Sequence, residues 1–419
     1  MGTLMAQRLA GEHQLSGQAW LACLPRIAQR DGKTQDRQIG WAVWALFLTA
    51  ICALATFGPR RTVTPAYYHG AAQWVAGLPL YNDEGIGFIY LPQAAILFAP
   101  FTALPPLMAE VFWRCFTIGI YAWGVRRFSA LAENSSPRPL FALASLIAIP
   151  LAGGSARNGQ ATLLMAGLMM AAVACMATRS WWRAAGCLVL ALAIKPLAIV
   201  LILLSAALYR PMIGRLLIAA CVMLAIPFLT QDSAYVQSQY LAYIRTVQAA
   251  TDHSNVEYFA QLFGLLRVVG LEVPSHVQTL LRALFAGLTL LACLWYSRRM
   301  DAARWGVYFY SLSTCYLMLF NPRTENNTYS MLAPAIAVFF AWALIEGRLV
   351  HTVLLGAIAF GTVGTFEFGR LLTPAAQSIW LAPLMAIGFS GCVIADLFKD
   401  QAAAPRLPAG MLAKPGRQT

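Results

Sequence analysis

Residues 184–210 read AAGCLVLALAIKPLAIVLILLSAALYR, and the way in which this stretch meets the membrane decides the fold. Its length suits a single span, but Arg183 precedes it and Arg210 ends it. Because arginine favours the cytoplasmic side, a single span would place one of these ends outside and would invert every later loop. A proline breaks the helical hydrogen-bond ladder, and Lys195-Pro196 lies in the middle. We therefore predict two half-helices that turn back at Lys195-Pro196 and line a polar cavity.

The composition of the whole chain agrees with a membrane protein. Of its 419 residues, 59% are hydrophobic and 11% are charged, compared with about 25% charged in soluble domains. Apolar runs recur along the whole length, which predicts an all-α polytopic membrane protein. The net charge of +13 resides in short loops and tails, a pattern typical of orientation signals and anionic-lipid contacts rather than of nucleic-acid binding. Nine scattered cysteines without a CxxC motif favour neither a disulfide framework nor a metal site, and no cofactor is expected.

The arginine clusters and the apolar runs together predict about ten full spans and two broken or re-entrant segments. The second broken segment is 91–104, which at 14 residues is short for a crossing. The spans are expected near 41–58, 107–125, 137–153, 159–178, 211–229, 277–296, 303–320, 329–345, 350–366 and 377–396. A transmembrane domain (40–398) would then lie between a basic cytoplasmic tail (1–39) and a disordered cytoplasmic tail (399–419). Three loops are expected on the outer face: 59–92, 230–276 and 321–329.

The first outer loop contains the stretch RTVTPAYYHGAAQWVAGLPLYNDEGIGFIYLP (61–92). It alternates aromatic residues with glycines and carries the acidic pair Asp83-Glu84. A long ordered loop with clustered polar groups usually has a function of its own. The alternative is an interfacial collar of aromatic residues that only anchors the protein.

Three basic residues are candidates for binding an anion. Lys195 is an ionisable residue within a membrane segment, and such residues are functional by default, although a lysine can also snorkel to the interface. Arg157 and Arg323 lie on the outer side, where the charge rule discourages them. The planar guanidinium suits phosphate, although an ordinary ion pair with an acidic residue would also explain these arginines.

Two further groups of polar residues are candidates for binding a sugar. Asn326 and Asn327 offer the dense hydrogen-bonding capacity that sugar hydroxyls require, or they begin the helix that follows. Tyr67, Tyr68 and Tyr90 could stack against a sugar ring, and they could equally anchor the protein at the interface.

Six motifs occur in an order that resembles glycosyltransferase family 87, the polyprenyl-phosphate-sugar-dependent enzymes with the GT-C fold. The likeness runs from about residue 41 to residue 345. The motifs are YYHGAAQWVAGLPLY, FIYLP, NGQATLLMAGLMMA, AAGCLVLALAIKPLAIVLILL, SNVEYFAQLFGLL and NPRTENNTY. Within them, His69, Asn158, Gln160 and Tyr329 join the candidate substrate-binding residues.

The resemblance implies an activity as well as a fold. It implies a GT-C-like active site between the outer loops and the membrane. There a hexose, mannose-like, would pass from a polyprenyl-phosphate donor to a lipid or glycan acceptor, usually with inversion and without a nucleotide donor. The expected location is the bacterial inner (plasma) membrane, with both termini cytoplasmic. Lys195, together with Arg157 or Arg323, would neutralise the phosphate leaving group.

One position departs from the family pattern. The resemblance implies an aspartate as general base just after the first span, but that stretch reads RTVTPAYY and no carboxylate lies between Trp41 and Tyr81. The replacements nearest to the matched motifs are Asp83, Glu84 and Glu325, with Asp252 and Glu257 as reserves. A transporter or flippase of lipid-linked saccharide and a catalytically inactive homologue therefore remain alternatives. A carboxylate beside Lys195 would favour the enzyme.

Overall fold

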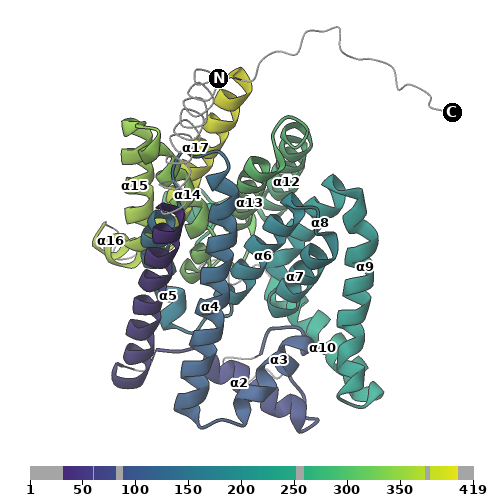
Figure 1. Cartoon of the computed structure of the whole chain (residues 1–419). Coiled ribbons are helices and arrows are strands. Elements are labelled where there is room, and N and C mark those ends of the chain that lie inside the picture. Colours follow the sequence, from purple (N-terminus) through teal and green to yellow (C-terminus); the bar gives the residue numbers. More distant parts are fainter. Residues whose placement is uncertain (1–31, 60, 82–87, 252–258, 373–377, 404–419) are drawn as a thin grey trace, which may run out of the picture.

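The computed structural model describes residues 32–59, 61–81, 88–251, 259–372 and 378–403 (Figure 1). Within these ranges all regular structure is helical and no strand occurs, so the predicted all-α class is confirmed. The helices are Gly32–Phe57, α2 (Thr64–Val75), α3 (Pro92–Thr102), α4 (Pro106–Glu133), α5 (Phe141–Arg157), α6 (Thr162–Ala177), α7 (Trp181–Ile194), α8 (Ile199–Leu208), α9 (Arg210–Ala225), α10 (Ser233–Thr251), α11 (Leu262–Val268), α12 (Ser275–Tyr296), α13 (Ala302–Phe320), α14 (Ala333–Ile345), α15 (Leu349–Val363), α16 (Thr365–Leu372) and α17 (Leu381–Ala403).

Each of the ten predicted spans overlaps a helix, although the bounds differ by several residues. Four helices in the described part of the chain are long and apolar enough to cross a membrane: Gly32–Phe57, Arg210–Leu229, Ser275–Tyr296 and Leu381–Lys399. Six shorter apolar helices of 10–17 residues accompany them. The chain is therefore a helical membrane protein.

Helix α6 forms the centre of the bundle. Most of its side chains are buried, from Thr162 to Met176, and it packs against α4 on one side and α7 on the other. The contact with α4 is close because a Cβ atom added at Gly124 would lie only 2.7 Å from the Cα atom of Gly167. Small residues of this kind let two membrane helices approach until their backbones touch.

The predicted break at Lys195-Pro196 is present. Helix α7 ends at Ile194, Lys195 is extended with φ −146° and ψ 136°, and a 3₁₀ turn leads into α8. The Trp181 and Tyr209 rings, at the two outer ends of this unit, lie 5.5 Å apart between centroids. An unbroken helix would separate these residues by about 42 Å at 1.5 Å per residue. Residues 181–209 therefore form a hairpin with Lys195 at its turn, as predicted.

The other short segment, 91–104, is also a half-length helix. Helix α3 has 11 residues, which gives about 17 Å against a hydrocarbon core of about 30 Å. It packs against α2, and the two helices lie together at one end of the molecule (Figure 1).

The segment 230–276 is predicted from the sequence as a long loop on the outer face. It contains α10 and α11, so much of it is helical. The reason lies in its aromatic residues, which pack on the region around α2: Tyr235 lies 5.3 Å from Trp74 and Tyr243 lies 5.8 Å from Tyr81, between ring centroids. Helix α10 thereby becomes part of the layer that α2 and α3 form.

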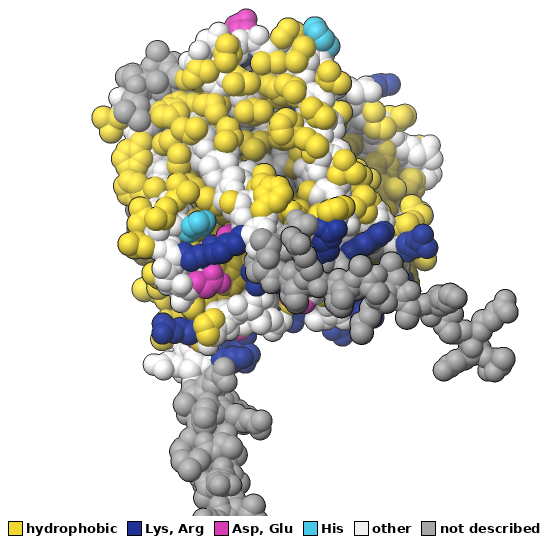
Figure 2. All heavy atoms as spheres, turned by 90° about the horizontal axis from the view of Figure 1, so that it is seen from above, with side chains coloured by type: hydrophobic (Ala, Val, Ile, Leu, Met, Phe, Trp, Pro, Cys, Tyr) yellow, Lys and Arg dark blue, Asp and Glu magenta, His cyan; other side chains and the backbone are white. Residues whose placement is uncertain are grey.

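Different helices lie at the two ends of the molecule. The helix Gly32–Phe57 begins and α17 ends toward one end, whereas α2, α3 and α10 lie at the other (Figure 1). Figure 2, which looks onto the first of these ends, shows many lysine and arginine side chains there. Because basic residues favour the cytoplasmic side, this distribution agrees with an orientation in which α2, α3 and α10 face outward.

This orientation predicts which positions react from outside the cell. Single cysteines in place of Asp83, Asp252 and Arg323, in a background without the native cysteines, should react with a membrane-impermeant maleimide in intact cells. A cysteine in place of Arg298 should react only after the membrane is opened. Failure of all three outer positions to react would contradict the topology.

Candidate functional site

Lys195 lines a cavity of about 210 Å³ at the end of the molecule that carries α2 and α3. The cavity is built from segments far apart in the sequence: the residues just before α3, the α7–α8 turn, α10 and the segment that follows α13. Its lining is Ile89, Tyr90, Lys195, Pro196, Leu197, Thr246, Val247, Asn321, Pro322, Arg323, Glu325 and Thr328.

The Lys195 ammonium is held by the start of α6. Its Nζ atom donates hydrogen bonds to Thr162 Oγ1 at 2.8 Å and to Gln160 Oε1 at 3.5 Å. The Tyr90 ring lies 6.0 Å from Nζ. Because an ammonium has three donors, one N–H remains for a ligand in the cavity. The break in the helix thus places a cation at a defined point, rather than on a side chain that snorkels to the interface.

Glu325 and Arg323 bring one negative and one positive side chain to the same cavity. Both side chains are exposed, and the charge of Glu325 acts on Lys195. Within the described ranges the Glu325 carboxylate forms no ion pair with Arg323, whose guanidinium lies 5.3 Å from the centre of the Phe259 ring. Of the two arginines considered as partners of Lys195, Arg323 therefore shares its cavity and Arg157 does not.

An apolar cavity of about 330 Å³ adjoins the lysine cavity. The two share Pro196, Leu197, Asn321 and Pro322. The remaining lining is largely apolar: Ile199, Val200, Leu317 and Phe320, with Arg282 and Tyr316. A ligand with a charged head at Lys195 would thus find apolar surface directly beside it.

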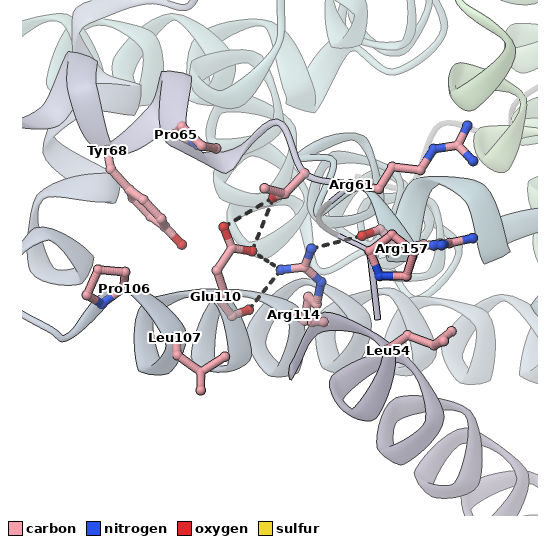
Figure 3. A pocket seen from close by; sticks show the side chains of 12 residues that line it. Leu54, Arg61, Pro65, Tyr68, Pro106, Leu107, Glu110, Arg114 and Arg157 are labelled. Carbon is pink, nitrogen blue, oxygen red and sulfur yellow. Dashed lines mark hydrogen bonds and ion pairs between the residues drawn. The ribbon is translucent and has the colours of Figure 1, made fainter. Parts of the chain in front are cut away.

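A second polar cavity, of about 440 Å³, lies between the helix Gly32–Phe57, α2 and α4 (Figure 3). Its polar centre is Glu110 on α4. Thr62 donates to both carboxylate oxygens, at 3.2 and 3.1 Å, and Thr64 and Arg114 also bond to the carboxylate. Arg114 is buried, and its other terminal nitrogen donates to the carbonyl of Arg157 at 2.8 Å. Three side chains, those of Thr62, Thr64 and Arg114, therefore converge on this carboxylate.

Two other arginines and a tyrosine complete the polar lining of this cavity. Figure 3 shows the Tyr68 ring directed toward Glu110, and the Arg61 and Arg157 guanidinium groups directed away from it. The buried hydroxyl of Tyr68 forms no hydrogen bond of regular geometry with the described residues, although Thr64 lies close enough to lower its pKa slightly. Burial first, and then the charge of Glu110, raise the pKa of this phenol well above its ordinary value, so that Tyr68 remains a hydrogen-bond donor at physiological pH.

The α5–α6 turn, residues 157–160, links residues of both polar cavities along the chain. Arg157 at its start lines the Glu110 cavity, whereas Gln160 at its end holds Lys195. Gly159 allows the tight turn with a φ of +65°, and its carbonyl accepts a hydrogen bond from Trp113 at 2.8 Å. Asn158, which is buried, accepts from the backbone of Val63 through its own carbonyl at 3.0 Å.

Several predicted site residues serve contacts within the protein. Tyr67 is buried, stacks on Phe98 with 4.6 Å between ring centroids, and accepts a hydrogen bond from the backbone of Ala161. Asn326 donates to the Ser378 carbonyl at 2.8 Å, and Tyr329 donates to the Ala260 carbonyl at 3.0 Å.

The other candidates are placed as follows. The backbone carbonyl of Asn327 accepts from Ser330 at 2.9 Å. His69 is exposed on α2 and lines neither polar cavity. Asp83, Glu84, Asp252 and Glu257 lie outside the described residues.

The sequence analysis does not identify Glu110 and Arg114 as candidates. Both fall within the predicted span 107–125, four residues apart, and are absorbed into it. The signal that singles out Lys195, an ionisable side chain within a membrane segment, applies equally to this pair.

Comparison with known proteins bears on the resemblance seen in the sequence. The profile of glycosyltransferase family 87 matches residues 88–322, which is more than half of the chain and includes α4 and the α7–α8 hairpin. No curated protein matches the chain significantly. The family match, on a helical membrane fold with polar cavities at one end, shows that the chain belongs to glycosyltransferase family 87 and is a membrane glycosyltransferase.

Proposed function

We propose that this protein transfers a hexose, mannose-like, from a polyprenyl-phosphate donor to a lipid or glycan acceptor, with inversion. The reaction takes place at the outer face of a bacterial inner (plasma) membrane, which a GT-C-like domain crosses about ten times with both termini in the cytoplasm. The substrates and the surrounding membrane lipids are its partners, and nucleic acid is not.

One observation carries this proposal: Lys195, Arg323 and Glu325 line a single cavity. Two cations suit the phosphate of the donor, because negative charge develops on the leaving oxygen as the sugar departs. A carboxylate beside the lysine supports an enzyme over a transporter or flippase of lipid-linked saccharide, which would need the cations but no proton acceptor.

The adjoining apolar cavity supports a donor that carries a lipid. A polyprenyl chain is apolar and would lie along the surface of Ile199, Val200 and Phe320. Its phosphate would then lie at the shared residues Pro196 and Asn321, next to Lys195.

The chemistry balances as a single displacement. The acceptor hydroxyl oxygen attacks the anomeric carbon, and the bond from that carbon to the phosphate oxygen breaks. Its electron pair leaves with the polyprenyl phosphate, which Lys195 neutralises. A carboxylate takes the hydroxyl proton. The candidates for this carboxylate are Asp83, Glu84 and Glu325, and Glu325 lines the lysine cavity.

The test is incubation of the purified protein with defined polyprenyl-phosphate hexoses. Octyl mannoside and octyl glucoside serve as acceptors, and the released polyprenyl phosphate and the glycosylated product are measured by mass spectrometry. We expect release with at least one hexose, in proportion to the product. Movement of intact donor across proteoliposomes, without any release, would contradict the transferase and would favour the transporter.

A further inference from the structure

We propose that Glu110 on α4 is the general base of this reaction, and that its cavity receives the acceptor hydroxyl. This inference rests on the proposed function. It assigns the proton transfer to a residue outside the outer loops.

The Glu110 carboxylate is both accessible and held in a fixed orientation. Glu110 is partly exposed, with 18% of its side chain accessible, so a substrate can reach it. Its carboxylate is oriented by Thr62 and Thr64 on one side and by the buried Arg114 on the other. A general base has to be held within hydrogen-bond reach of the proton that it removes, and a carboxylate fixed on a helix by three partners satisfies that requirement.

The second argument is the unpartnered hydroxyl of Tyr68. It lies in the same cavity, is buried, and faces the carboxylate (Figure 3). Buried polar groups normally have partners, so an unpartnered one in a cavity points to a ligand. A sugar or other polyhydroxylated acceptor would accept from Tyr68 with one oxygen while another donates to Glu110.

The third argument is the position of the two cavities. In an inverting displacement the attacking oxygen and the leaving oxygen lie on opposite sides of the anomeric carbon. Glu325 lies in the cavity of Lys195 and therefore on the side of the leaving phosphate. Glu110 lies in the other polar cavity, whose lining residue Arg157 is three positions before Gln160, the hydrogen-bond partner of Lys195. A sugar held between the two cavities would have Glu110 on the side of attack and Lys195 on the side of the leaving phosphate.

The stretch after the first helix has no carboxylate of its own but contacts one from α4. Thr62 and Thr64 belong to that stretch, and both bond to the carboxylate of Glu110, 46–48 residues later in the chain. A carboxylate therefore lies beside the stretch that follows the first helix, although α4 supplies it.

The test removes the carboxylate from position 110 and introduces one at position 64. Glu110→Gln should lower the transfer of mannose from polyprenyl-phosphate mannose to octyl mannoside by roughly 10²–10⁴-fold, with donor binding retained. Adding Thr64→Asp to Glu110→Gln should recover at least tenfold of this loss. Thr64 is the first residue of α2, where an aspartate is favourable because it faces the positive end of the helix dipole. The matched control is Glu133→Gln, which breaks an ion pair with Arg126 near the other end of α4 and should leave the rate unchanged.

The pH profile separates a base from a structural ion pair. Wild-type kcat should fall at acidic pH as the base becomes protonated, Glu110→Gln should lack this fall, and the double variant should regain it. A near wild-type rate in Glu110→Gln overturns the proposal. The proposal is also overturned if Glu110→Gln lowers kcat, Thr64→Asp does not restore it, and kcat of Glu110→Gln still falls at acidic pH.

Two further outcomes are decisive. If Glu110→Gln does not fold, Glu110→Asp keeps the charge beside Arg114 and withdraws the carboxylate by one methylene. A folded Glu110→Asp protein should then lose at least tenfold in rate, and an unchanged rate overturns the assignment. If the wild-type protein transfers no hexose at all, the proposed function is wrong, and so is the assignment of Glu110 as its general base. If the wild type transfers hexose and Glu110→Gln is fully active, the proposed function stands and only the assignment of Glu110 as general base is wrong.

Discussion

Replacing Lys195 by Met should reduce the release of polyprenyl phosphate by roughly 10²–10³-fold, the usual effect of removing one group that stabilises developing charge in a buried site. Methionine keeps much of the length and apolar volume of the lysine stem but has no charge. The ammonium is positioned by Thr162 and Gln160, and it has one donor left for the phosphate. Its attraction for the leaving oxygen grows as the bond breaks, so kcat should fall more than KM rises.

Two control variants make this result specific. Lys195→Arg keeps the positive charge and should retain more activity than Lys195→Met. Lys33→Met removes an exposed lysine at the start of the first helix and should leave the rate unchanged. The assay is the initial rate of lipid-phosphate release, together with size-exclusion elution to show that each variant is folded. An unchanged kcat in a folded Lys195→Met protein would remove Lys195 from the leaving-group site.

Gly167→Leu should prevent the protein from folding into an extractable, monodisperse form. A Cβ atom at this position would lie 2.5 Å from the backbone carbonyl oxygen of Ile120, an atom that cannot move without shifting α4. Overpacking of a core typically costs about 1–3 kcal/mol, and a clash with backbone lies at or above the upper end of that range. Because α4 carries Glu110 and α6 carries Thr162, separation of these helices would also disrupt both cavities.

The matched control for this change is Gly119→Leu. Gly119 lies on α4 as well, but a Cβ atom there would meet no atom within 4 Å. We expect this variant to give the wild-type yield and melting temperature in detergent, whereas Gly167→Leu gives aggregated protein. A melting temperature of Gly167→Leu within about 2 °C of the wild type would show that the α4–α6 contact tolerates a large side chain, contrary to the packing described above.

Local properties of the sequence were sufficient for the helices and for the hairpin. Apolar runs of span length have to satisfy their backbone groups internally, so their helical state follows from composition. The break at Lys195-Pro196 was predictable because a proline cannot continue the helical ladder and because the arginines at both ends require the chain to return. The choice of Lys195 as a candidate site residue followed from the high free energy of an ionisable side chain in a membrane segment.

The combination of residues at the site depended on the tertiary structure. Glu110 meets Thr62 and Thr64 across 46–48 residues, and Lys195 meets Thr162 across 33. Sequence spacing alone did not show that Arg323 shares the cavity of Lys195 while Arg157 lines the cavity of Glu110. The helical state of 233–251 was likewise missed, because its aromatic residues pack on segments far away in the sequence, such as Trp74 and Tyr81. The physical reason is the same in each case: a helix is specified by residues a few positions apart, whereas a cavity is specified by how separate helices pack.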